Sequence, residues 1–527
     1  MSDDLVFFNG IHGSSGEYAT PPRRIATVAA AARAHSMPRD EIQRTGAAAR
    51  RSRDKQFALA DDYNPDDLED VGWGMVLPEL TPDDHEGRAR QQQILEALEP
   101  LLALRRRQAG SMYCDDLWYT QGESPQEFLS RFGVNFGRVE PGPLPYYILL
   151  CASPQEISFE FQYMLDIQFA VGRLYFDDVK SYRMYAEHMA GQEEREPPAQ
   201  RKATFFGVVN GDKVDDDPAT WNGVTHLIEG LHDYYAKKKA CGNDLALEDE
   251  AGQPIRRMPT RAHRALVEHW ALDIHTRSAA TRERLLSLLG GEDKPAFLLV
   301  LAHGLDYKCD EPGLVKGQGA LICNGWRPGE MAFEHAVFGG QLDENRDLAG
   351  QIAFLFACHS AGTPRTRLAF PDPSEKTSGE PPEKKLSPKQ LAPHSLVARL
   401  PQRMLALGAQ AVIGHIDNAC DSSFRWFNPR TRKFFTHTGE FRQLMNGVFR
   451  GARVGHAMCA FNERYAVLAA VFTGLDDREA EGHDVSDREW AYTYRSYLDA
   501  RNYILLGDPA ARITTAAPTQ PVQQANP

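Results

Sequence analysis

The 527-residue chain has few of the features that tie a protein to nucleic acid or to a membrane. Its 59 lysines and arginines are outnumbered by 72 aspartates and glutamates, and the resulting net charge of −13 opposes general binding to nucleic acid or anionic lipid. No stretch approaches the roughly 18 uninterrupted apolar residues of a membrane-spanning helix. The first eight residues lack the basic region and apolar core of a secretory signal. We therefore expect a soluble, cytoplasmic protein with no nucleic-acid or membrane partner.

Cysteine is also scarce and scattered. The eight cysteines form no CxxC pair, so their spacing predicts neither a disulfide framework nor a zinc knuckle. The acidic stretches 212–217 and 476–481 lack the regular ligand spacing of a calcium loop, and solvated loops explain both better. We expect reduced thiols and no cofactor or metal.

Two apolar runs of strand length each end at a reactive side chain that small residues follow. The first begins at Phe297 and ends at His303-Gly304, and the second begins at Ile352 and ends at Cys358. Such runs are typical of parallel strands buried on both faces, and catalytic groups of open α/β sheets lie just beyond the carboxyl ends of such strands. A histidine and a cysteine placed in this way can face each other across a cleft. The sequence therefore predicts a thiolate–imidazole pair.

Strand-like and helix-like segments alternate along most of the chain. The candidate strands are 74–77, 146–151, 203–209, 296–302, 320–323, 352–357, 409–414 and 502–508, and helical patterns lie between many of them. This order implies a parallel sheet with helices on its faces. Residues 29–53 predict an exposed helix rich in arginine and alanine. The tail after Thr514 has too little apolar bulk to pack.

Five short motifs are spread over residues 70 to 515. They are Ala302-His303-Gly304, the stretch 357–363 around Cys358, Leu400-Pro-Gln-Arg403, Ala411-Val-Ile-Gly-His415 and the stretch 500–509 that ends in Gly-Asp-Pro. Together they resemble the caspase-like clan of cysteine peptidases, and within it bacterial CHAT and gingipain-type domains. The resemblance implies an α/β fold: a three-layer αβα sandwich with a mostly parallel sheet in two tandem subdomains. We divide the chain into an N-terminal extension (1–65), a degenerate caspase-like half (66–290), a catalytic half (291–515) and a disordered tail (516–527).

The resemblance also implies roles for individual residues. His303 matches the histidine of the clan and Cys358 its nucleophile, with the backbone N–H groups of Gly304 and Cys358 facing the oxyanion. Bacterial relatives usually have Gly or Tyr-Gly after the cysteine, whereas this chain has His-Ser. Asp417 and Asp421 lie where the clan often builds its primary specificity pocket, and there they would pair with a basic substrate side chain. Solvated loop carboxylates explain these two aspartates equally well.

These features predict a bacterial-type cysteine endopeptidase that cleaves protein substrates after lysine or arginine. The segment 363–394, rich in Pro, Lys, Glu and Ser, is too long for an ordinary connection, and we expect its cleavage or a regulatory protein partner to control activity. Two alternatives stay open. Cys358-x-Ser360-x-Gly362 partly matches the nucleophile elbow of an α/β-hydrolase, in which Ser360 would act. A catalytically silent caspase-fold sensor or adaptor is the other.

Overall fold

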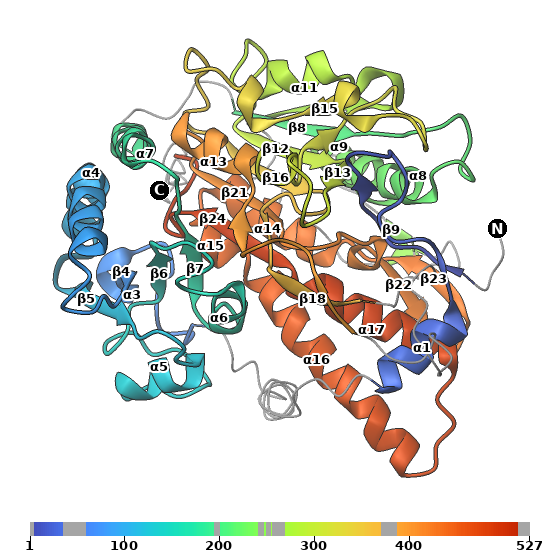
Figure 1. Ribbon diagram of the computed structural model, residues 1–527, viewed down its shortest axis with the longest axis horizontal. Helices are drawn as coiled ribbons and strands as arrows, with labels where there is room; N and C mark the ends of the chain where they lie inside the picture. Colours follow the sequence, from blue (N-terminus) through green and yellow to red (C-terminus); the bar gives the residue numbers. More distant parts are fainter. Residues whose placement is uncertain are drawn as a thin grey trace, which may run out of the picture.

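The structure, a computed structural model, describes residues 5–34, 59–193, 201–240, 247–248, 254–255, 269–369 and 387–514. Its centre is a ten-stranded sheet (Figure 1). In spatial order the strands are β11 (Trp270–Thr276), β8 (Arg201–Gly207), β12 (Phe297–Leu301), β16 (Ile352–Phe356), β21 (Ala411–His415), β24 (Tyr503–Gly507), β7 (Ala170–Arg173), β6 (Tyr147–Leu150), β4 (Trp73–Pro78) and β5 (Tyr113–Tyr119). All neighbouring pairs are parallel except β21 and β24. The α/β class with a mostly parallel sheet is confirmed.

The sheet contains a repeated strand order. At one edge the strands lie in the order β5-β4-β6-β7. The second of these strands in the sequence, β5, forms the edge beside the first, β4, and the other two lie on the inner side of β4. At the other edge β11-β8-β12-β16 repeats this order. The pairing of β24 with β21 and β7 joins the two groups into one sheet. Strands β8 and β11 thus lie beside the strands of the second half, and the domain boundary that we placed near residue 290 stays a prediction.

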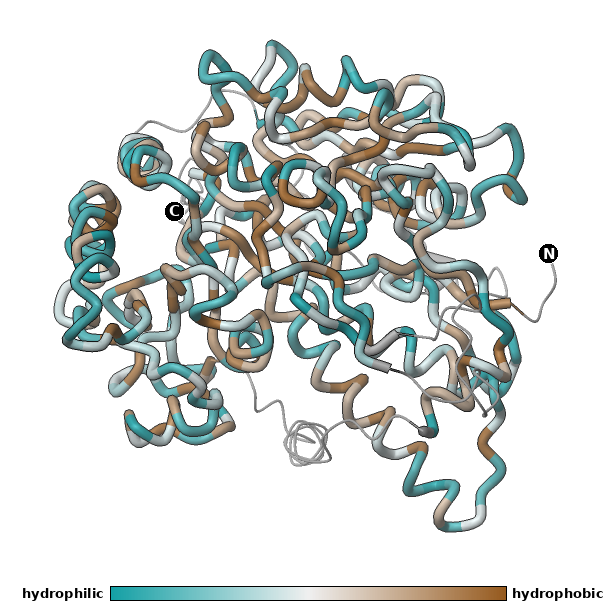
Figure 2. The backbone as a smooth tube through the Cα atoms, in the orientation of Figure 1, coloured by the Kyte–Doolittle hydropathy of each residue, from teal (hydrophilic) through white to brown (hydrophobic). Residues whose placement is uncertain are grey.

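Helices cover both faces of this sheet (Figure 1). On one side lie α4 (His85–Ala109), α7 (Val179–Glu193) and α13 (Arg399–Ala406); on the other lie α9 (Gly230–Ala240), α14 (Gly439–Arg450), α15 (Val454–Ala457) and α16 (Cys459–Ala480), with α17 (Asp487–Arg501) packed on α16. Phe354 and Phe356 alternate along β16 and both contact Phe441 of α14, with ring centroids 5.4 and 6.2 Å apart. Figure 2 shows hydrophobic residues concentrated along the central strands and hydrophilic ones on the outer helices.

Shorter elements surround this core. The remaining helices are α1 (Ile25–Ala34), α3 (Leu68–Val71), α5 (Pro125–Arg131), α6 (Phe159–Leu165), α8 (Pro218–Gly223), α11 (Arg282–Leu288) and α12 (Leu314–Gly317). A small four-stranded sheet has the order β15 (Ala336–Val337), β14 (Leu321–Ile322), β13 (His303–Asp306), β2 (Ile11–His12). Two-stranded pairs are β1 (Leu5–Val6) with β3 (Arg23–Arg24), β9 (Leu247–Glu248) with β10 (Pro254–Ile255), β17 (Gly362–Thr363) with β20 (Leu396–Val397), β18 (Thr366–Ala369) with β19 (Ser387–Gln390), and β22 (Arg425–Asn428) with β23 (Lys433–Thr436).

The expectation of an exposed helix at residues 29–53 is wrong for its described part. Helix α1 buries Val28, Ala29 and Ala32 against α17. Arg33 holds it there through ion pairs with Glu479 and Asp487 at 3.0 and 2.7 Å. Residues 35–53, like the tail 516–527, lie outside the described residues. None of the helices in the described ranges has the length and apolar composition needed to cross a membrane.

Candidate active site

The ends of two neighbouring strands bring His303 and Cys358 to one edge of the sheet. Strands β12 and β16 pair in register up to Leu301 and Phe356, and the two residues follow directly. Gly304 is pressed against the backbone of Cys358, because a Cβ at Gly304 would lie 1.9 Å from the carbonyl oxygen of Cys358. Only glycine fits at this position. The small sheet β15-β14-β13-β2 begins at this point.

The imidazole of His303 is held by a buried carboxylate. Its Nε2 atom lies 2.9 Å from Oδ2 of Asp217, and the exposed fractions of the two side chains are 1% and 0%. The rings of Tyr18 and Trp326 meet the imidazole edge-on, each with its centroid 5.8 Å away. Asp217 immediately precedes α8, which follows β8, the strand next to β12. Parallel neighbours thus supply both members of the pair.

The charge of His303 and several hydrogen bonds keep Asp217 ionised despite its burial. Its carboxylate accepts from the hydroxyls of Tyr18 (2.7 Å) and Thr220 (2.6 Å). Burial acts to raise the pKa of Asp217, but His303 and these donors outweigh burial and lower the pKa to about 2. An ionised carboxylate can only accept, so it holds a proton on Nε2 of His303. In the neutral ring Nδ1 then carries the lone pair that a general base needs.

Asp217 is the site residue that the sequence analysis missed. We assigned the stretch 212–217 to a solvated loop, and this is wrong for Asp217, whose exposed fraction is 0%. The usable signal was local. Asp217-Pro218 has the form of a helix start, with proline at the first helical position, and it follows a buried strand.

The thiol of Cys358 is closed off from solvent. The residue is 1% exposed, and its Sγ accepts a hydrogen bond from the N–H of Ala419 over 3.3 Å. Burial raises the pKa of the thiol well above its ordinary value, although the Ala419 bond acts in the opposite direction. Within the part of the chain that the structure describes, no hydrogen bond joins this sulfur to His303. Burial therefore favours the protonated form of this thiol.

The residues after Cys358 have structural contacts. His359 has a φ of 56°, and its Nδ1 lies 2.9 Å from the hydroxyl of Thr363. The Ser360 hydroxyl donates to the carbonyl of Leu355 over 2.8 Å and accepts from the N–H of His415 over 3.1 Å. Both partners of Ser360 are backbone groups, so this geometry gives no support to Ser360 as a nucleophile.

Asp417 holds the guanidinium of Arg367. Nη1 of Arg367 lies 2.5 Å from Oδ1 of Asp417, and each side chain is 10% exposed. With its amide oriented to satisfy both neighbours, Asn418 accepts from Nη1 of Arg367 over 3.1 Å and donates to the carbonyl of Asn9 over 3.2 Å. Burial acts to raise the pKa of Asp417, but Arg367 lowers it below its ordinary value. Arg367 belongs to β18 at the start of the expected regulatory segment, of which residues 370–386 lie outside the described part.

Asp421 has different partners from Asp417. Asp421 pairs with Arg425 at 3.1 Å and with Arg495 at 2.7 Å. Burial acts to raise the pKa of Asp421, but the two arginines lower it. Asp421 is thus already neutralised, by two cations other than Arg367. In the described ranges no three His, Cys, Asp or Glu side chains gather as metal ligands.

Comparison with known proteins finds distant structures only. No family model matches the chain, and no curated protein matches it. A solved structure described as a protease aligns with 85% of this chain and 79% of its own, at 10% identity and a TM-score of 0.42. Two structures of the Saccharomyces cerevisiae separase–securin complex align with 69% of this chain at 10% identity and a TM-score of 0.25. The aligned part covers 15% and 16% of the matched chains. At these values the likeness does not identify a function.

Proposed function

We propose that this chain is a cysteine endopeptidase of caspase-like architecture, with Cys358 as nucleophile, His303 as base and Asp217 as the residue that positions the histidine. The observation that carries the proposal is the buried Asp217–His303 pair, which lies beside a strand-end cysteine. A buried, ionised carboxylate on an imidazole is costly unless it is fully paired. Its function as an orienting group for a base explains why the site retains it.

The proposed reaction is acyl transfer. The thiol proton moves to Nδ1 of His303 as the sulfur attacks the scissile carbonyl, and the backbone N–H groups of Gly304 and Cys358 stabilise the oxyanion. The peptide C–N bond then breaks, and the imidazolium returns the proton to the leaving amine. Water hydrolyses the thioester and restores the thiol. The close approach of Gly304 to the backbone of Cys358 supports their joint function as donors.

A preference for arginine or lysine before the cleaved bond is the proposed specificity. The ion pair between Arg367 and Asp417 supports this proposal, because it puts a guanidinium on that carboxylate. The charge of Asp417 also acts on the thiol of Cys358, which supports a specificity site close to the proposed nucleophile. A substrate side chain must replace Arg367, so movement of β18, by cleavage of its segment or by a regulatory partner, is the proposed control. The physiological substrate would be a protein that presents a basic residue in an extended segment.

A catalytically silent scaffold is the competing proposal, and the 1% exposure of Cys358 favours it. An electrophilic peptide with arginine at its reactive end separates the two. The peptidase proposal predicts a covalent adduct at Cys358 that is absent from Cys358→Ala and reduced in Asp417→Asn. A neutral analogue of the probe is the matched control. Equal labelling of all eight cysteines, or none at Cys358 after denaturant-free incubation at high probe concentration, would favour the scaffold.

A further inference from the structure

We propose that residues 5–24, here called the strap, are an internal cover of the catalytic pair, and that a peptide reaches Cys358 only when the strap is displaced. The effect of the strap on peptide cleavage rests on the proposed function. The position of the strap over Cys358 and His303 rests only on the contacts described below. The strap comprises β1, β2, β3 and the turns between them. It lies across the edge of the sheet where His303 and Cys358 meet.

Gly10 lies over the nucleophile. A Cβ at Gly10 would be 3.8 Å from Sγ of Cys358 and 3.3 Å from the side-chain amide of Asn418, and the φ of Gly10 is 105°. A scissile carbonyl must approach a nucleophile to about 3 to 3.5 Å before it reacts. The strap backbone and a substrate peptide bond therefore cannot occupy this space together.

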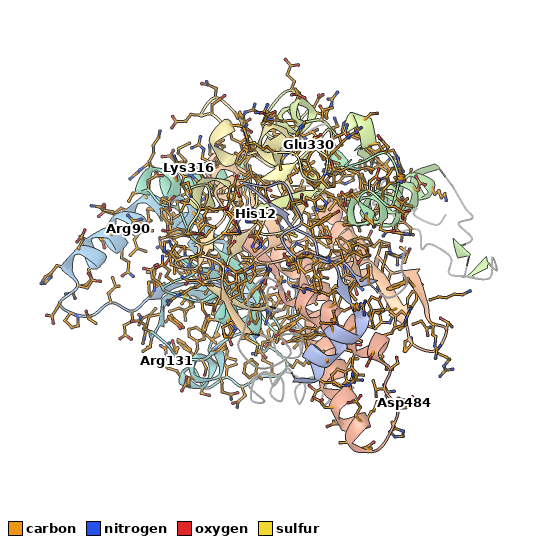
Figure 3. All side chains as sticks on the ribbon, turned by 45° about the vertical axis from the view of Figure 1, so that its right-hand side comes forward. His12, Arg90, Arg131, Lys316, Glu330 and Asp484 are labelled. Carbon is orange, nitrogen blue, oxygen red and sulfur yellow. The ribbon has the colours of Figure 1, made fainter. Side chains whose placement is uncertain are left out.

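The strap also occupies a strand edge that begins at the catalytic histidine. Ile11 and His12 of β2 pair in parallel with Leu305 and Asp306 of β13, and the N–H of Gly13 donates to the carbonyl of Asp306 over 2.8 Å. Extended peptides commonly bind by adding a strand to such an edge. Figure 3 labels His12 near the middle of the view, and its side chain is only 14% exposed. The strap thus packs against the edge of β13 and is not a free terminus.

Tyr18 closes the histidine side of the site. Its hydroxyl donates to Oδ1 of Asp217, and its ring lies edge-on to the ring of His303. Burial and the neighbouring Asp217 raise the pKa of Tyr18, so the hydroxyl remains a donor. The strap therefore contacts the groups around all three proposed catalytic positions: the sulfur, the imidazole and the carboxylate.

The strap has the features of a segment that can open locally. Its strands are two residues long, and Ser14, Ser15 and Glu17 are exposed. Short strands with exposed turns open at low free-energy cost compared with a central strand. The exposed pair Pro21-Pro22 separates the turns from α1, which the Arg33 ion pairs hold on α17. Displacement of the strap would thus leave the core helix α1 in place.

A single substitution away from the catalytic groups tests this cover. Gly16 has a φ of 71°, its carbonyl accepts from the N–H of Gly329 over 3.0 Å, and a Cβ would lie 1.8 Å from the carbonyl oxygen of Glu330. Gly16→Ala should therefore displace the strap from residues 329 and 330. Gly122→Ala is the matched control, because Gly122 has a φ of 84° and open space around its Cβ position. It tests the cost of the backbone conformation without the collision.

The measurement is the rate at which iodoacetamide alkylates each cysteine of the folded full-length protein, read by peptide mass spectrometry. Cys323, which is fully buried and whose pKa burial raises to about 12, reports global unfolding. The strap predicts that Gly16→Ala accelerates alkylation of Cys358 by about tenfold or more, a factor that corresponds to about 1.4 kcal/mol, with Cys323 unchanged. Gly122→Ala should behave as wild type.

An unchanged rate at Cys358 in Gly16→Ala overturns the strap. If alkylation of Cys358 and of Cys323 accelerates together in Gly16→Ala, the same measurement on Tyr18→Phe decides, because this substitution removes one hydrogen bond and leaves the strap backbone intact. Faster alkylation of Cys358 alone in Tyr18→Phe supports the strap. An unchanged rate in Tyr18→Phe contradicts it. Faster alkylation without peptide cleavage supports the strap and contradicts the proposed function. Cleavage by wild type with an unchanged alkylation rate in both variants supports the proposed function and overturns the strap.

Discussion

Asp217 and His303 lie 86 residues apart in the sequence, and Oδ2 of the one is 2.9 Å from Nε2 of the other. The contact fixes which imidazole nitrogen carries the proton and therefore which can act as base. It also requires that the loop after β8 and the end of β12 keep their relative position. Any change that rotates this carboxylate should affect catalysis before it affects the fold.

Asp217→Asn is expected to lower kcat/KM by about 10²- to 10⁴-fold, because the amide no longer holds the histidine in the tautomer that a base requires. The measurement is the pH profile of kcat/KM on a basic peptide, together with a thermal unfolding curve. Asp215→Asn on the same loop is the control, since Asp215 is exposed. Equal activity of the two variants would contradict the assigned function of Asp217.

Asp417→Asn should change the substrate preference, whereas Asp421→Asn should change the stability. Loss of Asp417 removes the partner of a desolvated guanidinium, which commonly costs about 2 to 5 kcal/mol, so the ratio of kcat/KM for arginine over neutral peptides should fall. Loss of Asp421 leaves Arg495 and Arg425 without their carboxylate, and this should lower the free energy of unfolding with the ratio unchanged. The same ratio in wild type and Asp417→Asn would exclude Asp417 as a specificity determinant.

Ser360→Ala should reduce stability while peptidase activity persists. The substitution leaves the buried His415 N–H without its acceptor, at a cost of about 1 to 3 kcal/mol, whereas the Leu355 carbonyl still accepts from the N–H of Ala357 over 3.0 Å. Urea unfolding measures the loss, and peptide cleavage at a temperature where the variant is folded measures the activity. Loss of activity in folded Ser360→Ala, together with cleavage by Cys358→Ala, would favour the serine hydrolase alternative.

Acidic pH should lower the free energy of unfolding through protonation of Glu193, whose carboxylate pairs with Arg105 at 2.7 Å. Burial acts to raise the pKa of Glu193, but Arg105 outweighs it and lowers the pKa from 4.5 to about 2. A depressed pKa contributes stability that is present above pH 4.5 and lost as the pH falls toward 2. The contribution is about 3 kcal/mol at neutral pH.

Glu193→Gln should therefore lower the free energy of unfolding at pH 7 and converge toward wild type near pH 2. Denaturant unfolding at a series of pH values measures both. Glu187→Gln, an exposed position on the same helix, is the control. A difference between wild type and Glu193→Gln that does not change with pH would show that charge pairing is not the source.

The central strands were predictable because burial on both faces leaves a continuous apolar run, as in β12 and β16. Strand β7 was not predicted, since its sequence Ala-Val-Gly-Arg contains a glycine and an arginine. The structure explains both residues. A Cβ at Gly172 would lie 2.2 Å from the carbonyl oxygen of Gly507, and buried Arg173 donates to the carbonyl of Ala152. These constraints come from segments far along the chain.

The candidate site divides in the same way. His303 and Cys358 stand out from their local pattern, and the structure brings both to one edge of the sheet. The partners Asp217 and Tyr18 do not stand out, because their contacts span 86 and 199 residues. The sequence around Asp417 and Asp421 does not distinguish their roles. The two residues differ in the arginines that they pair with in the folded chain, Arg367 for Asp417 and Arg495 for Asp421.

The most direct test of the central claim uses a peptide library whose cleavage products are identified by mass spectrometry. Wild type, Cys358→Ala, His303→Ala and the double variant are compared, each also in the Gly16→Ala background so that the strap does not limit access. We expect cleavage after arginine or lysine, a loss of several orders of magnitude in each single variant, and a double variant little worse than either, because nucleophile and base act as a unit. Cleavage of the same bonds by Cys358→Ala at the wild-type rate would contradict the account.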